Sequence, residues 1–184
     1  MTINSPSIVI VSSSLATESR SRLAAKYAAE VMQRHDCVID FLDLAELSVK
    51  PYPESENDAK TLNAVAQFNQ AHAWVLASPV YNFGMSGVLL NFLHYALDSD
   101  HGRFKPFVII ETMAGLRSAM ANDHLARTMT YEVSAVQVGP AVYAVGDTGV
   151  NRLTGEIAPD VRDRIEKAMA ALAHFARARM TLQS

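Results

Sequence analysis

Apolar residues in this chain recur in two patterns, short continuous runs and longer stretches with helical spacing. Residues 7–11 (SIVIV), 73–78 (AWVLAS) and 106–112 (PFVIIET) are short apolar runs, and they predict buried β-strands. Residues 37–44 (CVIDFLDL) predict the second strand in chain order, and residues 135–145 (AVQVGPAVYAV) contain a fifth. Cys37, the only cysteine, is expected to be a buried apolar residue of its strand.

The stretches between these runs have the spacing of amphipathic helices. Helices are predicted at about 19–34, 85–97 and 119–131, and a long amphipathic helix follows Pro159. A further helix before the third strand carries one stripe of side chains, formed by Leu62, Val65, Ala66 and Asn69. Strands therefore alternate with helices along the whole chain.

This alternation predicts an α/β protein, a parallel sheet with helices on both faces. No repeat, linker or low-complexity tract interrupts it, so we expect one domain over residues 1–184. With five strands, the flavodoxin-like and the Rossmann-like orders both remain open. In either order a ligand binds outside the carboxyl ends of the strands.

Composition narrows the function classes. Hydrophobic residues make up 49% of the chain and charged residues 19%, which is a globular composition. The net charge of -3 gives no electrostatic argument for nucleic acid or an anionic membrane as a partner. With one cysteine and no signal-peptide pattern, we expect a reducing, cytoplasmic location.

Residues 61–97 contain no Asp, Glu, Lys or Arg, which raises the question of a membrane span. Polar residues flank the run on one side, and Pro79, Asn82 and Gly84 interrupt it in the middle. We therefore interpret it as helix, strand, turn and helix. The last helix, residues 85–97, is apolar around its whole circumference, so one face is expected to pack on the sheet and the other on a partner.

Three loops at strand ends have unusual chemistry. The first, residues 12–21, crowds serine and threonine hydroxyls and Arg20 around the start of a helix, where free backbone N–H groups favour an anion such as a phosphate. A serine-rich helix cap without a ligand explains the same residues equally well. Neither G-x-G-x-x-G nor Gly-Lys-Ser/Thr is present, which weakens a dinucleotide site and excludes a P-loop.

The second loop, residues 78–84 (SPVYNFG), has the proline, asparagine and glycine that let backbone pass close to a flat ligand. An ordinary strand-to-helix turn is the alternative. The third loop, residues 112–115 (TMAG), is small and open, and its backbone amides could reach polar atoms on the rim of a ring system.

Together these loops resemble those of the NADPH-dependent FMN reductases. The most specific match is residues 77–98, ASPVYNFGMSGVLLNFLHYALD, against the family pattern Pro-x-Tyr-Asn, a spacer, and Ser-Gly-x-Leu-Lys-Asn-x-Leu-Asp. Leu90 and His94 replace the Lys and Asp of that pattern. Residues 105–115 and 139–172 also match in place and character, so the resemblance covers nearly the whole chain.

The resemblance implies the flavodoxin-like fold, a doubly wound five-stranded parallel sheet with strand order 2-1-3-4-5. It implies FMN as cofactor and NADPH or NADH as hydride donor. Carried over position by position, the implied phosphate contacts are Ser13, Ser19, Arg20 and Ser21. The implied contacts along the isoalloxazine ring and ribityl chain are Pro79, Val80, Tyr81 and Asn82, and those at the pyrimidine edge are Thr112, Ala114 and Gly115.

The function that the resemblance implies is an FMN-dependent NAD(P)H oxidoreductase, which passes electrons to free flavin, a quinone, an azo compound or a similar acceptor. Because the cofactor carries the reactive atoms, no side chain is nominated as catalytic. The resemblance also implies a homodimer through the helix at 85–97 and leaves a tetramer open. The acceptor itself does not follow from the sequence.

Other functions have less support. The six histidines are scattered, without HExxH or a close Cys/His pair, so we expect no metal site. No Gly-x-Ser-x-Gly elbow offers a hydrolase nucleophile. Two alternatives remain open: a flavin-binding electron carrier or sensor without nicotinamide turnover, and a ligand-free module that has kept only the fold.

Overall fold

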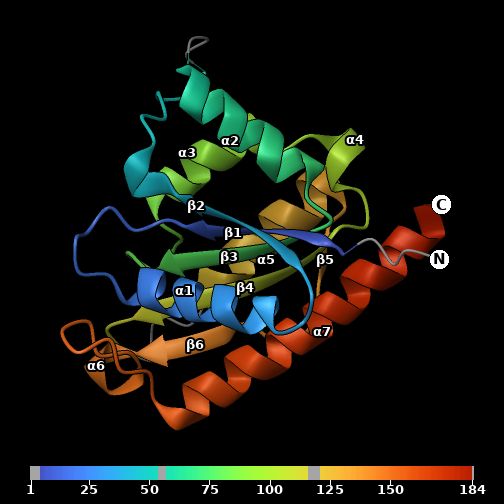
Figure 1. The fold of residues 1–184 in the computed structure, drawn as a ribbon. Helices are drawn as coiled ribbons and strands as arrows, with labels where there is room; N and C mark the ends of the chain where they lie inside the picture. The colour runs from blue at the N-terminus through green and yellow to red at the C-terminus, as the bar shows by residue number, and fades with distance from the viewer. Residues whose placement is uncertain (1–4, 54–56, 116–120, 184) are drawn as a thin grey trace.

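The computed structural model describes residues 5–53, 57–115 and 121–183. Strands and helices alternate as the hydrophobic pattern predicted (Figure 1). The strands form one parallel sheet in the order β2-β1-β3-β4-β5, with β6 also paired to β4. This order confirms the flavodoxin-like arrangement and rules out the Rossmann-like one.

All the strands lie within about a residue or two of the predicted runs, and they are β1 (Ser7–Ser12), β2 (Val38–Asp43), β3 (Ala73–Pro79), β4 (Pro106–Met113), β5 (Val136–Gln137) and β6 (Val142–Val145). β1, β3 and β4 are the most deeply buried strands, because helices cover both of their faces. The prediction for Cys37 was wrong in part: it precedes β2 and is only half-buried.

The predicted fifth strand consists of two pieces. β5 pairs with Pro106 and Phe107 at the start of β4, whereas β6 pairs with residues 110–113 at its end. Between them Gly139 has a positive φ of 72°, and Pro140 has no N–H to donate to a ladder. The break in the strand therefore follows from its Gly-Pro dipeptide.

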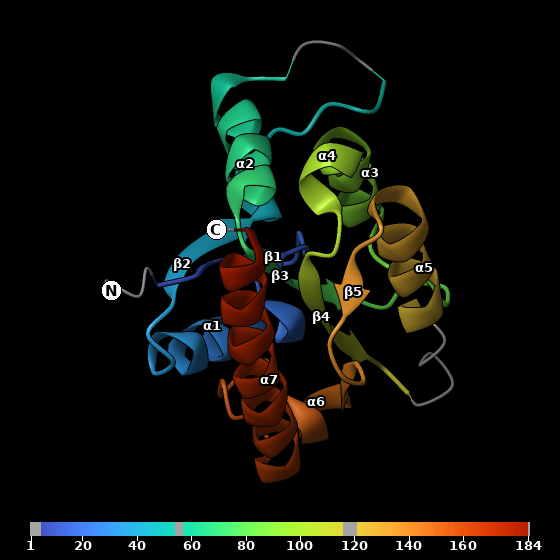
Figure 2. The ribbon, with the colours of Figure 1, turned by 90° about the vertical axis from the view of Figure 1, so that its right-hand side faces the viewer.

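The helices are α1 (Arg20–Gln33), α2 (Ala59–Gln70), α3 (Gly87–Ala96), α4 (Ser99–Gly102), α5 (Ala121–Val133), α6 (Gly146–Gly149) and α7 (Pro159–Gln183), with a 3₁₀ turn η1 at Leu44–Glu46. α1 and α7 cover one face of the sheet, and α2, α3 and α5 cover the other (Figure 2). None of these described helices combines the length and the apolar character of a membrane span.

The stripe predicted for α2 is present in the helix but is not its buried face. The helix buries Thr61, Ala64 and Phe68, while Leu62 is 56% exposed. The rotation follows the largest side chain, because the ring of Phe68 stacks on that of Trp74 with centroids 4.4 Å apart. Burying this aromatic pair outweighs the burial of one leucine.

The all-apolar helix has one fully buried face, formed by Leu89, Phe92, Leu93 and Ala96. Its outer face is partly covered by the chain's own loop at residues 50–53. The Asn91 side chain donates to the Lys50 carbonyl at 2.8 Å and accepts from the Tyr52 N–H at 2.8 Å. The surface at this place is therefore formed jointly by side chains of α3 and by the loop at residues 50–53.

Candidate flavin site

The three predicted loops meet at one edge of the sheet. The tips of β1, β3 and β4 all point toward the side of the molecule that carries α6 (Figure 1). A cavity of about 280 Å³ lies among them. Its lining includes several of the residues predicted for the ligand: Ser19, Arg20, Pro79, Val80, Tyr81, Thr112 and Ala114.

The other predicted site residues lie beside the cavity lining. The Ser13 side chain is buried and donates to the Ala77 carbonyl at 3.0 Å. The Ser21 hydroxyl lies 3.1 Å from that of Ser19. Asn82 occupies an exposed turn, and Gly115 directly follows the lining residue Ala114.

The first loop ends in a helix cap. Ser19 has extended backbone angles, and its hydroxyl accepts a hydrogen bond from the Arg22 N–H at 3.2 Å. The N–H groups of Arg20 and Ser21, at the start of α1, have no acceptor in the part of the chain that the structure describes. These donors and the positive end of a 14-residue helix together favour an anion at this place.

Two arginines, Arg20 and Arg152, and two acidic residues, Asp147 and the lining residue Glu18, set the charge at this end of the cavity. Arg20 binds the Asp147 carboxylate through both oxygens, at 3.0 and 2.9 Å. Arg152 approaches the same carboxylate, with its backbone N–H at 3.3 Å and its Nε at 3.7 Å. The hydrogen bond from Arg20, followed by that from the Arg152 backbone, lowers the pKa of Asp147. Two cations thus share one carboxylate beside the free N–H groups.

The second loop forms a tight turn at the cavity rim. Tyr81 and Gly84 exchange backbone hydrogen bonds of 3.0 and 2.9 Å. The two central residues, Asn82 and Phe83, have positive φ of 49° and 63°, as in the type I′ turns of hairpins. The turn leaves Tyr81 54% exposed and Phe83 59% exposed. An aromatic side chain in this left-handed conformation is strained, a feature that often marks functional loops.

Buried serine hydroxyls tie the first loop to the second. Ser86 donates to Ser13 Oγ at 2.9 Å, and its hydroxyl also accepts from the Leu89 N–H at 3.3 Å as the N-cap of α3. Ser78 Oγ accepts from the Ser86 N–H at 3.0 Å. This network fixes the distance between the two loops, so the walls of the cavity are held by the scaffold rather than by a ligand.

The third loop closes the cavity from the side of β4. The Thr112 carbonyl accepts from the Val80 N–H at 2.9 Å, which ties this loop to the second. Thr112 is nearly buried, whereas Ala114 is exposed. Small side chains therefore leave the backbone of this loop open to a ligand in the cavity.

Glu111 lies directly beneath this loop and is fully buried in β4. Neither of its carboxylate oxygens has hydrogen-bond geometry with a described residue. Burial raises the pKa of Glu111 to about 7, and the backbone N–H of Asn122 only partly opposes the shift. The same carboxylate contributes, after burial, to raising the pKa of Tyr143 on the neighbouring strand β6.

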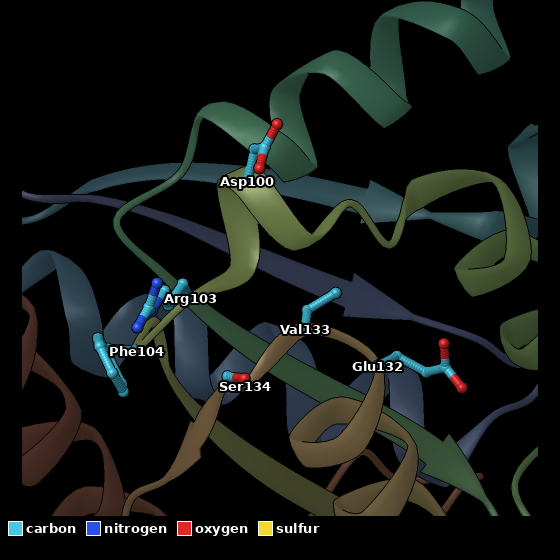
Figure 3. Close-up of a pocket in the computed structure, with 6 residues that line it drawn as sticks. All are labelled: Asp100, Arg103, Phe104, Glu132, Val133 and Ser134. Carbon is cyan, nitrogen blue, oxygen red and sulfur yellow. The ribbon is translucent and has the colours of Figure 1, made fainter.

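A larger hollow of about 520 Å³ lies at the opposite, amino end of the strands and is lined by Asp100, Arg103, Phe104, Glu132, Val133 and Ser134 (Figure 3). Its carboxylates point away from one another and from Arg103, so no set of polar groups converges there (Figure 3). Ligands of open parallel sheets bind at the carboxyl ends instead. We therefore assign the ligand to the smaller cavity.

The residues of this region that sequence reasoning missed include Ser86, Asp147 and Arg152. Asp147 and Arg152 belong to the segment that follows β6, a fourth strand tip at the same edge, so its polar composition (GDTGVNR) was a usable signal. Ser86 had the position of a helix cap before the apolar helix. Within residues 5–53, 57–115 and 121–183, no three His, Cys, Asp or Glu side chains gather as metal ligands.

The sequence of the cavity loops matches a known family. A sequence model of the NADPH-dependent FMN reductases matches residues 6–149, more than half of the chain. The chain belongs to the NADPH-dependent FMN reductase family. The match spans all three loops of the cavity and confirms the expected class of enzyme, an oxidoreductase that works with FMN and NAD(P)H.

Among relatives of this chain, an FMN-dependent NADPH-azoreductase of Staphylococcus saprophyticus is 27% identical over 154 residues, which cover 79% of each chain. An oxidoreductase of Corynebacterium diphtheriae has a similar structure, with a TM-score of 0.80, 20% identity and coverage of 94% of this chain and 97% of that one. An NADH:FMN oxidoreductase in its apo form gives a TM-score of 0.75 at 22% identity, with 95% and 90% covered.

A flavodoxin from the domain Archaea also shares the fold, with a TM-score of 0.65 at 9% identity over 93% of this chain and 98% of that one. At these identities the solved structures support the fold alone. The family match supports the class of reaction, and the roles of individual cavity residues in this FMN reductase remain predictions.

Proposed function

We propose that this protein transfers hydride from NAD(P)H to FMN and passes the electrons on to free flavin, a quinone, an azo compound or a similar small acceptor. One observation carries the proposal. A single cavity joins an anion-binding helix start, a Pro-Val-Tyr wall and an open backbone loop at the tips of three neighbouring strands. These are the parts that a phosphate tail and a flat ring require.

The residues at the start of α1 fit the phosphate of FMN. The free N–H groups of Arg20 and Ser21 and the guanidinium of Arg20 offer donors and positive charge. Ser19 borders the cavity, whereas Ser13 and Ser21 act from behind it through their buried hydroxyls. Arg152, which also lines the cavity, adds a second cation.

The second loop fits the ring and the ribityl chain. Pro79, Val80 and Tyr81 form a continuous wall of the cavity, and the strained turn at Asn82 holds Tyr81 at its rim. Proline and valine present flat apolar surface without competing hydrogen-bond donors. This wall would exclude water from one side of a bound ring and leave the other side open to a nicotinamide.

The third loop fits the pyrimidine edge of the flavin. When bound, FMN supplies the ring system that accepts and releases hydride. Backbone N–H groups of Ala114 and Gly115 would donate to that edge, and Thr112 would lie beside it. Amide donors favour the negative charge of a reduced ring without any change of protonation in the protein.

We also propose a symmetric homodimer that uses α3, within the predicted interface at 85–97. The exposed apolar surface at this edge includes Tyr52, which stacks on His94 of α3 with ring centroids 5.1 Å apart. A second copy would cover Tyr52 together with the half-buried outer face of α3. A reducing, cytoplasmic location stays a prediction that rests on the single cysteine.

The proposal is tested by adding FMN to the purified protein and recording its absorbance spectrum, followed by anaerobic addition of NADPH or NADH. We expect tight uptake of FMN and rapid bleaching of the flavin band, which a quinone or azo compound then restores. Uptake without bleaching would favour an electron carrier over a reductase. Failure to take up FMN would contradict the site itself.

A comparison of acceptors refines the assignment. The relative from Staphylococcus saprophyticus is an azoreductase, which supports azo compounds as the first acceptors to test. NADPH consumption measured in parallel with an azo dye, a quinone and free FMN ranks the three classes by kcat/KM.

A further inference from the structure

Arg22, in the first turn of α1, makes an unusually complete set of hydrogen bonds. Its Nη1 donates to the carbonyls of Ala16 and Thr17 at 2.6 and 3.2 Å, and its Nη2 donates to that of Ser14 at 2.7 Å. Its Nε and Nη2 also bind the two carboxylate oxygens of Asp43, at 2.6 and 3.3 Å. These bonds use all five N–H donors of the guanidinium.

The position of Arg22 determines which way the first loop faces. In a trans peptide the carbonyl of one residue and the N–H of the next point in opposite directions. Because the carbonyls of residues 14, 16 and 17 point at Arg22, the N–H groups of Leu15, Thr17 and Glu18 point away from it. None of these three N–H groups has an acceptor in the part of the chain that the structure describes.

Asp43 anchors this arrangement to the sheet. It is the last residue of β2, and its carboxylate also accepts from the Ala45 N–H at 3.1 Å. The Arg22 and Asp43 side chains are only 15% and 13% exposed. A largely desolvated, bidentate ion pair of this kind fixes geometry more strongly than a surface pair does.

We propose that Arg22, held by Asp43, is a positioning residue of the phosphate site. It draws three loop carbonyls to one side and thereby turns the N–H groups of Leu15, Thr17 and Glu18 to the other, as anion donors at the edge of the cavity that residues 14, 16 and 18 line. The inference rests on the proposed function, because the anion is the phosphate of FMN.

Arg20 and Arg22 then have different tasks. Arg22 has no donor left for a ligand, so it acts through the loop. Arg20 uses only Nε and Nη2 for Asp147 among the described residues, which leaves its remaining donors for the phosphate itself. Loss of Arg22 should therefore weaken the binding of the phosphate and leave the ring wall at Pro79, Val80 and Tyr81 intact.

The test compares FMN with riboflavin, which has the same ring and no phosphate. Dissociation constants for both are measured by flavin fluorescence on the wild type, R22M and R34M. Arg34 caps the carboxyl end of the same helix and forms an exposed ion pair with Glu166, so R34M is a matched control. We expect R22M to weaken FMN binding by about tenfold or more, because the loop N–H groups would no longer be held toward the charged phosphate. Riboflavin binding should change by less than about twofold, since riboflavin has no phosphate.

Each outcome decides a different point. A wild type that does not prefer FMN over riboflavin would contradict the phosphate site and the proposed function with it. A wild type that prefers FMN and an R22M variant with the same preference would overturn the role of Arg22 alone. If circular dichroism shows R22M to be unfolded, R22K and D43N are measured in the same way, since both keep part of the network. Either variant must then lose FMN preference for the inference to stand.

Discussion

The fold shifts the pKa values of two ionisable side chains, Lys105 and Glu111, by burying them. Lys105 is almost fully buried just before β4, where its ammonium donates to the Asn69 carbonyl at 2.7 Å and lies 4.3 Å from the centre of the Trp74 ring. Burial, with a contribution from Arg179, lowers its pKa to about 7. Burial raises the pKa of Glu111, within β4, because it penalises the charged form of either group.

Glu111 gives a pH-dependent prediction. Its pKa is about 7 in the folded protein and 4.5 ordinarily, so the folded state binds more protons between these values. The contribution of Glu111 to the free energy of unfolding therefore decreases as the pH rises from 4.5 to 7. E111Q removes that loss, so its advantage over wild type should grow across this window, by up to about 1.4 kcal/mol per pH unit, and stay constant above it.

Urea denaturation at a series of pH values measures this difference. E30Q, a change of an exposed glutamate on α1, serves as the control and should show no such trend. A difference between E111Q and wild type that does not vary between pH 4.5 and 7 would show that Glu111 does not titrate in that window.

The sequence predicted which residues line the cavity better than it predicted their hydrogen-bond and ion-pair partners. Ser19, Arg20 and the Pro-Val-Tyr segment line the cavity as expected. Arg22 lies just after this loop, in the first turn of α1, but most of its acceptors are backbone carbonyls, which have no signature in a sequence. Asp147 lies 127 positions from Arg20, and a pair at that separation depends on the sheet order.

The local sequence pattern predicts where helices and strands lie better than it predicts how they are oriented. Each predicted strand and helix of the described chain is present, because the short runs and the helical spacing are local properties. The rotation of α2 could not be predicted from its spacing, because it is set by the stacking of Phe68 on Trp74, a contact with another element. The split of the fifth strand at Gly139 was likewise visible only as a Gly-Pro dipeptide.

The turn at residues 81–84 gives a prediction at this scale. Phe83 has a left-handed backbone conformation, which costs about 1–2 kcal/mol in a non-glycine residue. Its side chain is 59% exposed, so burial offsets only part of this cost. F83G should therefore raise the free energy of unfolding by about 0.5–1 kcal/mol, after the extra flexibility of glycine in the unfolded chain is subtracted. N82G should raise it less, because asparagine tolerates this conformation.

Thermal unfolding of F83G, N82G and wild type at two protein concentrations checks this expectation. A loss of stability in F83G that depends on protein concentration would instead place Phe83 in a contact with a second copy. That result would contradict the assignment of Phe83 as exposed strain.

At the scale of the whole molecule, the apolar edge at α3 predicts the assembly. Light scattering after size exclusion should give twice the 20.1 kDa of one chain. V88R places a charge on the half-buried flank of α3, where Val88 also packs against the core, and a V88R protein that circular dichroism shows to be folded should be a monomer. F175R, on α7 at the other face of the sheet, should leave the mass unchanged. A dimer that survives V88R and dissociates with F175R would put the interface elsewhere.

The sheet order is what turns scattered polar segments into one site. In the order β2-β1-β3-β4-β5, the tips of β1, β3 and β4 are neighbours, so residues near 19, 80 and 113 line one cavity. The central claim is that this cavity holds FMN with its phosphate at the start of α1.

Titration of the purified wild type and of R20M with FMN, followed by flavin fluorescence, tests that claim most directly. The account predicts saturable binding at micromolar FMN or below in the wild type, and about tenfold weaker binding in R20M, because a charged donor to the phosphate is lost. Equal FMN affinity in the two proteins, or none in the wild type, would contradict it.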